Sequence, residues 1–67
     1  MRQADAAEIA RALQTLALPY REVLVMRDIN ELSYKEIASM LAVPIGTVMS
    51  RLSRGRAQLA AAIRRSS

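Results

Sequence analysis

Apolar residues recur along this chain at intervals of three and four, which is the spacing of one face of an α-helix. The first such stripe predicts a helix over residues 5–16, with acidic side chains in its first turn, where the helix dipole favours them. Residues 19–29 are apolar on nearly all sides. That pattern favours a central helix buried on two sides over a partner surface, and Pro19 is expected at its first position. The first stripe consists of Ile9, Leu13 and Leu16.

A break follows at residues 30–32, where Asn30 is the residue best suited to the left-handed conformation that ends helices. Ser33 and Glu36 then have the spacing of a capping box, in which each side chain binds the backbone amide of the other residue. The capping box predicts the start of a short third helix. Its apolar face is expected to carry Ile37, Met40 and Leu41.

The fourth predicted helix begins at Pro44 and extends to about residue 64, with residues 65–67 expected as a frayed tail. A tight turn at residues 42–43 separates it from the third helix, and Ala38 provides the small residue that a steep crossing of two helices requires. The pattern therefore predicts one all-α domain over residues 1–67, with four helices, no sheet and a helix-turn-helix at about residues 34–53. The inner face of the fourth helix consists of Val48, Leu52, Gly55, Leu59 and Ile63, and Gly55 is expected there as a close-packing point.

Composition excludes several classes of function. The chain has 67 residues with no Cys and no His, which excludes disulfides, zinc fingers and catalysis by thiol or imidazole. No pair of carboxylates suggests a catalytic cleft, so we expect neither an enzyme nor a cofactor. The N-terminus lacks the apolar core of a signal peptide, and no apolar run is long enough to cross a membrane, so a cytoplasmic protein is expected.

The net charge of +4 is unevenly distributed along the chain. Residues 1–45 carry five basic and six acidic side chains, whereas residues 46–67 carry five arginines and no acid. Such a basic segment indicates a polyanion partner. A solvated helix face with cations near the helix C-terminus explains the same distribution equally well.

The outer face of the fourth helix is small, hydroxylic and basic in its first turns, as expected of a helix that approaches base edges and phosphates. Gly46 has no side chain and so lets the backbone approach DNA, although Ser50 and Ser53 also fit an ordinary solvent-facing surface. Arg51 borders the core side of the helix. An ion pair of Arg51 with Glu36 or Asp28 is at least as good an interpretation as a DNA contact.

Several segments together resemble region 4 of bacterial sigma factors, and most closely the extracytoplasmic-function subgroup. The segments are LSYKEIA at 32–38, VPIGTV at 43–48, SRL at 50–52 and RGR at 54–56, and LALPYREV at 16–23 resembles the start of that family's second helix. The resemblance extends from about residue 9 to residue 63. Each motif alone is weak, but the combination is specific.

The resemblance implies a domain that recognises the −35 promoter element in double-stranded DNA as part of RNA polymerase holoenzyme. It also implies docking on the flap of the polymerase β subunit, and many members of the family are covered by an anti-sigma factor. By the same resemblance we expect the C-terminal domain of a longer sigma factor. The positions that match the family's DNA contacts are Arg27, Tyr34, Lys35, Gly46, Thr47, Met49, Ser50, Ser53 and Arg54.

Three positions depart from the family's pattern. Met49 stands where Lys or Arg is usual, and Glu31 and Ala42 stand where Gly is common, which implies slightly strained turns. Two alternative functions remain open: a sigma-like mimic that binds only an anti-sigma factor, and the DNA-binding domain of a response regulator. The polar, basic outer face of the fourth helix disfavours the mimic, and the length of that helix disfavours the response regulator.

Overall fold

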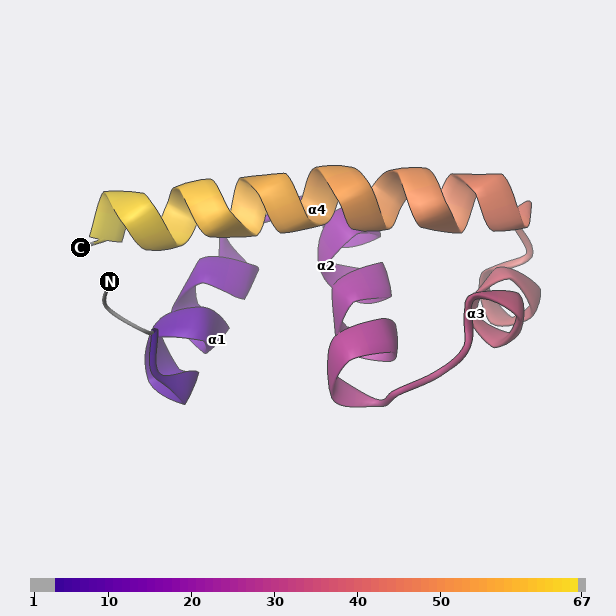
Figure 1. Cartoon of the computed structure of the whole chain (residues 1–67), viewed down its shortest axis with the longest axis horizontal. Coiled ribbons are helices and arrows are strands. Elements are labelled where there is room, and N and C mark those ends of the chain that lie inside the picture. The colour runs from indigo at the N-terminus through magenta and orange to yellow at the C-terminus, as the bar shows by residue number, and fades with distance from the viewer. Residues whose placement is uncertain (1–3, 67) are drawn as a thin grey trace.

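The long helix α4 forms one side of the molecule, and the other helices pack against it (Figure 1). The computed structural model describes residues 4–66, in which the predicted all-α architecture without a sheet is confirmed. The sequence predicts a frayed tail at residues 65–67, but residues 65 and 66 belong to α4. Residue 67 lies outside the described residues. The helices are α1 (Ala6–Gln14), α2 (Leu18–Leu24), the π-helical turn η1 (Val25–Ile29), α3 (Tyr34–Leu41) and α4 (Ile45–Ser66).

The helix starts follow from the local sequence. A carboxylate oxygen of Asp5 accepts a hydrogen bond of 2.8 Å from the backbone N–H of Glu8, which satisfies one of the free amides at the start of α1. The prediction that Pro19 opens the second helix is wrong by one residue, because α2 begins at Leu18 and Pro19 occupies its second position. The shift costs no hydrogen bond, because the second amide of a helix has no partner within the helix either.

The break between η1 and α3 differs from the prediction in one residue. Asn30 keeps right-handed angles (φ −89°, ψ −6°), and Glu31 is the residue with positive φ, at 57°. Asn30 still donates its N–H to the carbonyl of Val25, so the helical turn continues through it and the reversal falls one residue later. The left-handed residue of this break is therefore Glu31, one of the two positions for which slightly strained turns are implied.

The capping box at the start of α3 is confirmed. The Ser33 hydroxyl accepts from the Glu36 N–H at 3.0 Å, and the Glu36 carboxylate accepts from the Ser33 N–H at 2.8 Å. The backbone hydrogen bond from Ser33 lowers the pKa of Glu36, with the hydroxyl bond acting in the same direction. A lowered carboxyl pKa means that this cap contributes fully above the ordinary pKa of Glu and is lost as the pH falls through the lowered value.

The core forms where α2, α3 and α4 meet, and its most buried side chains are Val23, Ile37, Val48 and Leu52. The close-packing role predicted for Gly55 is confirmed, since a Cβ there would lie 3.2 Å from Cδ1 of Leu24. The prediction for Met40 is wrong, because its side chain is 67% exposed. Ile37, Ala38 and Leu41 face the core, and Met40 falls beside that stripe. None of the described helices is both long and apolar enough to cross a membrane.

The turn between α3 and α4 is strained at Ala42, which has left-handed angles (φ 56°, ψ 46°). For a residue with a Cβ this conformation costs roughly 1–2 kcal/mol. Ala42→Gly is therefore expected to stabilise the domain by up to about 1 kcal/mol, because the greater unfolded-state freedom of Gly offsets part of the relief.

Thermal unfolding followed by circular dichroism measures this effect. Ala60→Gly, at an exposed position within α4, is the matched control and is expected to destabilise by about 1 kcal/mol. A melting temperature of Ala42→Gly below that of the wild type would show that the turn is not strained.

Candidate nucleic-acid interface

A groove of about 440 Å³ lies between the first turns of α4 and the start of α2. Four of the nine residues predicted to contact DNA line this groove together. Pro19 and Tyr20 form its other wall, and Arg51 completes the lining. The four predicted residues are Gly46, Thr47, Ser50 and Arg54.

The helical repeat explains why these residues lie together. Residues four apart lie above one another on a helix, so positions 46, 50 and 54 form one row and positions 47 and 51 form the adjacent row. Gly46, Ser50 and Arg54 are exposed, whereas Thr47 and Arg51 are half-buried beside α2. A Cβ at Gly46 would have no neighbour within 4 Å, so the absence of a side chain there serves no packing contact within the domain.

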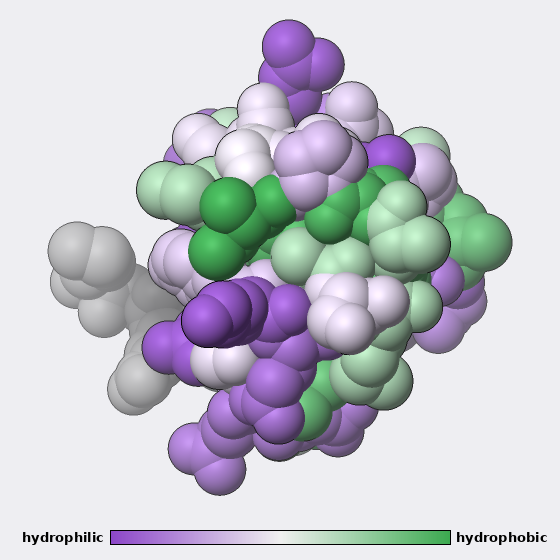
Figure 2. Space-filling view, turned by 90° about the vertical axis from the view of Figure 1, so that its right-hand side faces the viewer, coloured by the Kyte–Doolittle hydropathy of each residue, from purple (hydrophilic) through white to green (hydrophobic). Residues whose placement is uncertain are grey.

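The opposite edge of the outer face carries Met49, which is 52% exposed, and the exposed Ser53. Both belong to the same helix as the groove, but neither lines it. Ile45 is 48% exposed at the start of α4, and Met40 is exposed on α3. Figure 2 shows this end of the molecule, where apolar surface lies among strongly hydrophilic side chains.

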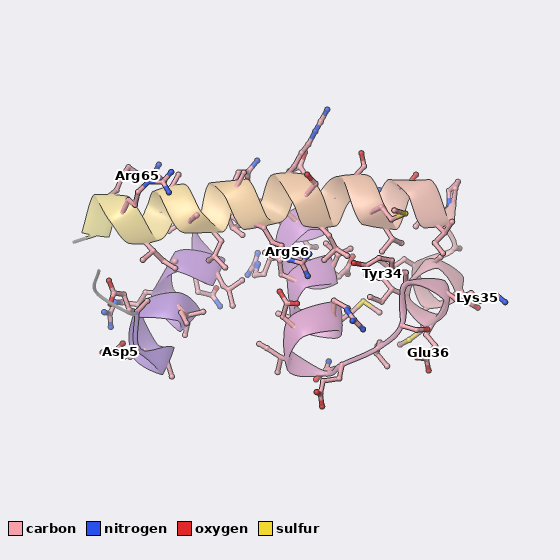
Figure 3. The ribbon with its side chains drawn as sticks, in the orientation of Figure 1. Asp5, Tyr34, Lys35, Glu36, Arg56 and Arg65 are labelled. Carbon is pink, nitrogen blue, oxygen red and sulfur yellow. The ribbon has the colours of Figure 1, made fainter. Side chains whose placement is uncertain are left out.

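The remaining predicted contacts lie near the start of α3. Lys35 is exposed and points away from the body of the domain (Figure 3). Tyr34 is half-buried, and the guanidinium carbon of Arg27 lies 5.3 Å from the centre of its ring, within the range of a cation–π contact. Arg27 also donates from Nη1 to the carbonyl oxygen of Leu32 at 2.9 Å. Arg27 and Tyr34 thus have partners within the domain, where they brace the loop between η1 and α3.

An ion pair that the sequence pattern did not predict joins α4 to η1. Nη2 of Arg56 lies 2.9 Å from Oδ1 of Asp28, and both side chains are 47% exposed. The hydrogen bond to Asp28 raises the pKa of Arg56, and the nearby Tyr34 acts in the same direction. The two partners are 28 residues apart, so no helical periodicity could have indicated the pair.

The expected ion pair of Arg51 with Glu36 or Asp28 is wrong. Asp28 pairs with Arg56, and the Glu36 carboxylate is occupied by the capping box. Within residues 4–66, no carboxylate forms an ion pair with Arg51 or Arg54. The groove is therefore basic without compensation. Its arginines and hydroxyls make anion binding the chemistry that this site offers. Across the described residues no group of three or more acidic side chains could hold a metal ion.

Gly46→Ala separates a role in folding from a role in binding. Because a Cβ at this position meets nothing, the substitution is expected to leave stability unchanged or raise it by up to about 1 kcal/mol. If DNA lies against the Gly46 backbone, the added methyl group should weaken DNA binding while the melting temperature is maintained. Parallel melting and duplex-titration measurements test this, and equal or tighter binding by Gly46→Ala would exclude close approach at this point.

Comparison with known proteins gives one family match. The family described as "Sigma-70, region 4" matches residues 6–59. The chain is 47% identical over 53 residues to the "ECF RNA polymerase sigma factor SigE" of Mycolicibacterium smegmatis, an alignment that covers 79% of this chain and 21% of that protein.

Two further relatives have the same kind of name. The "ECF RNA polymerase sigma factor SigW" of Bacillus subtilis is 45% identical over 56 residues, which covers 78% of this chain and 30% of SigW. The "ECF RNA polymerase sigma-E factor" of Escherichia coli is 38% identical over 48 residues, covering 72% of this chain and 25% of that factor. The chain thus spans between about a fifth and a third of the length of these relatives.

Proposed function

The chain belongs to the sigma-70 region 4 family, and from that premise we propose that it binds promoter DNA as the −35-reading domain of an extracytoplasmic-function sigma factor. In this proposal the outer face of α4 lies in the major groove, with Ser50, Ser53 and Arg54 nearest the bases. Thr47 lies near a phosphate. Lys35, which is positively charged and lies at the start of α3, contacts the DNA backbone on the other side of α4. The domain has no catalytic role in this function.

One observation carries the proposal: the first turns of α4 present hydroxyls and unpaired guanidinium groups on a surface with no acid. A solvated helix face would ordinarily mix charges of both signs. Elsewhere in the domain Arg27 donates to the Leu32 carbonyl, Arg21 donates to Gln14, and Arg56 pairs with Asp28. Arg54 lies on the outer face that the proposed docking turns toward DNA, and Arg51 lies on the adjacent flank. Phosphate attraction supplies much of the affinity of such a face.

A second surface supports a protein partner. A groove of about 310 Å³ between α1, η1 and α4 is mainly apolar and includes Ile29, which is 61% exposed. We propose that this groove takes part in docking on the β-subunit flap of RNA polymerase or on an anti-sigma factor. Amide hydrogen exchange of the domain, measured with and without a flap fragment, tests this. If no amide in residues 9–29 or 59–63 exchanges more slowly when the fragment is present, this part of the proposal is wrong. The apolar lining residues are Ile9, Leu13, Leu24, Ile29 and Leu59.

Selection from a pool of random duplex DNA tests the main proposal directly. The chain is mixed with the pool at low salt, and the retained duplexes are sequenced after several rounds. A shared short motif is the expected result. Retention of unrelated sequences, or of none, would favour the alternative in which the domain is a sigma-like mimic that binds only an anti-sigma factor.

Lys35 and Met49 are expected to change the salt dependence of binding in opposite directions. Each phosphate contact contributes about 0.9 to the slope of log K against log salt. Lys35→Ala should therefore weaken binding to all duplexes and flatten the slope by about one unit, whereas Met49→Arg should tighten binding and steepen it. Titrations of one selected duplex and one unrelated duplex at several salt concentrations measure both effects. A change in base preference with an unaltered slope for Lys35→Ala would contradict a backbone contact.

A further inference from the structure

Arg51 is the one charged residue lining the groove between α2 and α4 that neither the helix-turn-helix pattern nor the resemblance assigns to DNA. It is half-buried beside Pro19 and Tyr20, and no carboxylate in the described chain pairs with it. A guanidinium without a counter-ion attracts an anion, and this attraction is stronger at a partly buried position than in bulk water. Arg51 is therefore available to a ligand of negative charge in this groove.

The dimensions of the major groove indicate which anion this is. An α-helix with its side chains is about 10–12 Å across, and the major groove is about 12 Å wide. A helix that lies in the groove therefore turns its outer face to the bases and its two flanks to the sugar–phosphate walls. Gly46 and Ser50 lie on the outer face of α4, and Arg51 lies on the flank that turns toward α2.

We propose that the groove binds one backbone phosphate of the DNA duplex, with the Arg51 guanidinium and the Thr47 hydroxyl as its ligands. Thr47 lies one helical turn before Arg51 in the same row, so both can reach a single phosphate. A planar guanidinium provides two parallel donors for phosphate oxygens. The inference rests on the proposed function and adds a fixed phosphate position on the α2 side of the recognition helix.

The other flank of α4 explains why this contact matters in this chain. Arg56 on that side is held by Asp28, and Met49 has no charge. Among residues 4–66, the free cation on that side is Lys35 at the start of α3. The phosphate affinity of α4 itself is therefore concentrated on the side of Arg51, and loss of Arg51 should have a larger effect than loss of a distant arginine.

Single methylphosphonate substitutions test the contact. Each removes the charge of one backbone phosphate in a duplex obtained by the selection described above. At the phosphate that Arg51 contacts, we expect removal of the charge to weaken binding of the wild-type domain about tenfold. Arg51→Gln should weaken binding to the unmodified duplex by a similar factor and flatten the salt slope by about 0.9. Neutralisation of that same phosphate should then have a much smaller effect on the variant, because only the Thr47 hydroxyl still contacts it.

Matched variants make the result specific. Arg64→Gln removes the same charge from an exposed position near the other end of α4 and should leave the methylphosphonate pattern unchanged. Arg51→Lys should keep the salt slope but lose part of the affinity, because Lys lacks the planar fork. Melting of each variant by circular dichroism establishes that it is folded.

The outcomes are distinguishable. If the wild type selects a motif but Arg51→Gln retains the full methylphosphonate penalty at every position, the phosphate site is wrong and the proposed function stands. Arg51→Gln could also flatten the salt slope while every methylphosphonate position keeps its full penalty. Arg51 would then act only through long-range charge, and the phosphate site would be wrong. If the wild type binds no duplex selectively, the proposed function fails first and the phosphate site fails with it.

Discussion

Ile37→Ala is expected to cost about 2–5 kcal/mol of unfolding free energy, which is the range for deletion of a fully buried isoleucine side chain. Ile37 is completely buried where α3 packs on the core. A domain of this size gains only about 3–5 kcal/mol from its core, so a large fraction of the variant should be unfolded at room temperature. Urea titration followed by circular dichroism measures the change.

Met40→Ala is the control on the same helix. Its side chain is 67% exposed, so the substitution should change stability by no more than about 0.5 kcal/mol. Equal losses for Ile37→Ala and Met40→Ala would mean that α3 does not pack as described. A large loss for Ile37→Ala alone would confirm that one residue of this short helix holds the helix-turn-helix to the core.

Arg54→Ala is expected to have the largest effect on DNA recognition. A guanidinium can donate two hydrogen bonds to guanine in the major groove, and loss of such a pair costs about 1–3 kcal/mol, or roughly 5- to 150-fold in affinity. Arg54 is exposed at the open side of the groove and has no ion pair within residues 4–66, so no internal contact is lost with it. Repeating the duplex selection with the variant should show relaxed preference at one base pair.

Comparison of Arg54→Ala with Lys35→Ala distinguishes a contact to a base from a contact to the DNA backbone. A backbone contact changes affinity for all sequences alike, whereas a base contact changes the ranking of sequences. If Arg54→Ala keeps both its affinity and its base preference, the outer face of α4 does not lie against bases. The protein-binding mimic would then explain the chain better.

The features that could be predicted from the sequence are local ones. The capping box of Ser33 and Glu36 depends on residues three apart, and the inner face of α4 depends on the helical repeat, so both follow from the order of residues. Helix ends follow less directly from the sequence, since the reversal after η1 falls at Glu31 and not at Asn30. Asn favours the left-handed conformation, but the sequence alone does not decide whether Asn30 or its neighbour Glu31 adopts that conformation.

Contacts between distant segments could not be predicted in the same way. The ion pair of Arg56 with Asp28 and the wall that Pro19 and Tyr20 add to the groove depend on how α2 crosses α4. Periodicity placed Arg51 at the border of the core but did not identify its neighbour. The candidate DNA face was therefore predictable as a stripe on one helix, whereas its shape as a groove required the packing of a second helix.

The position of α4 in the chain has a consequence for biosynthesis. Helices α1, α2 and α3 each pack against α4, and they are 9, 7 and 8 residues long. Isolated helices of such length are marginal in water, so a nascent chain that ends before residue 45 should lack stable structure. Folding must then await the emergence of α4 from the ribosome. Until that moment the apolar faces around Leu24 and Ile37 are uncovered and available to chaperones, so the domain should form late and in a single step.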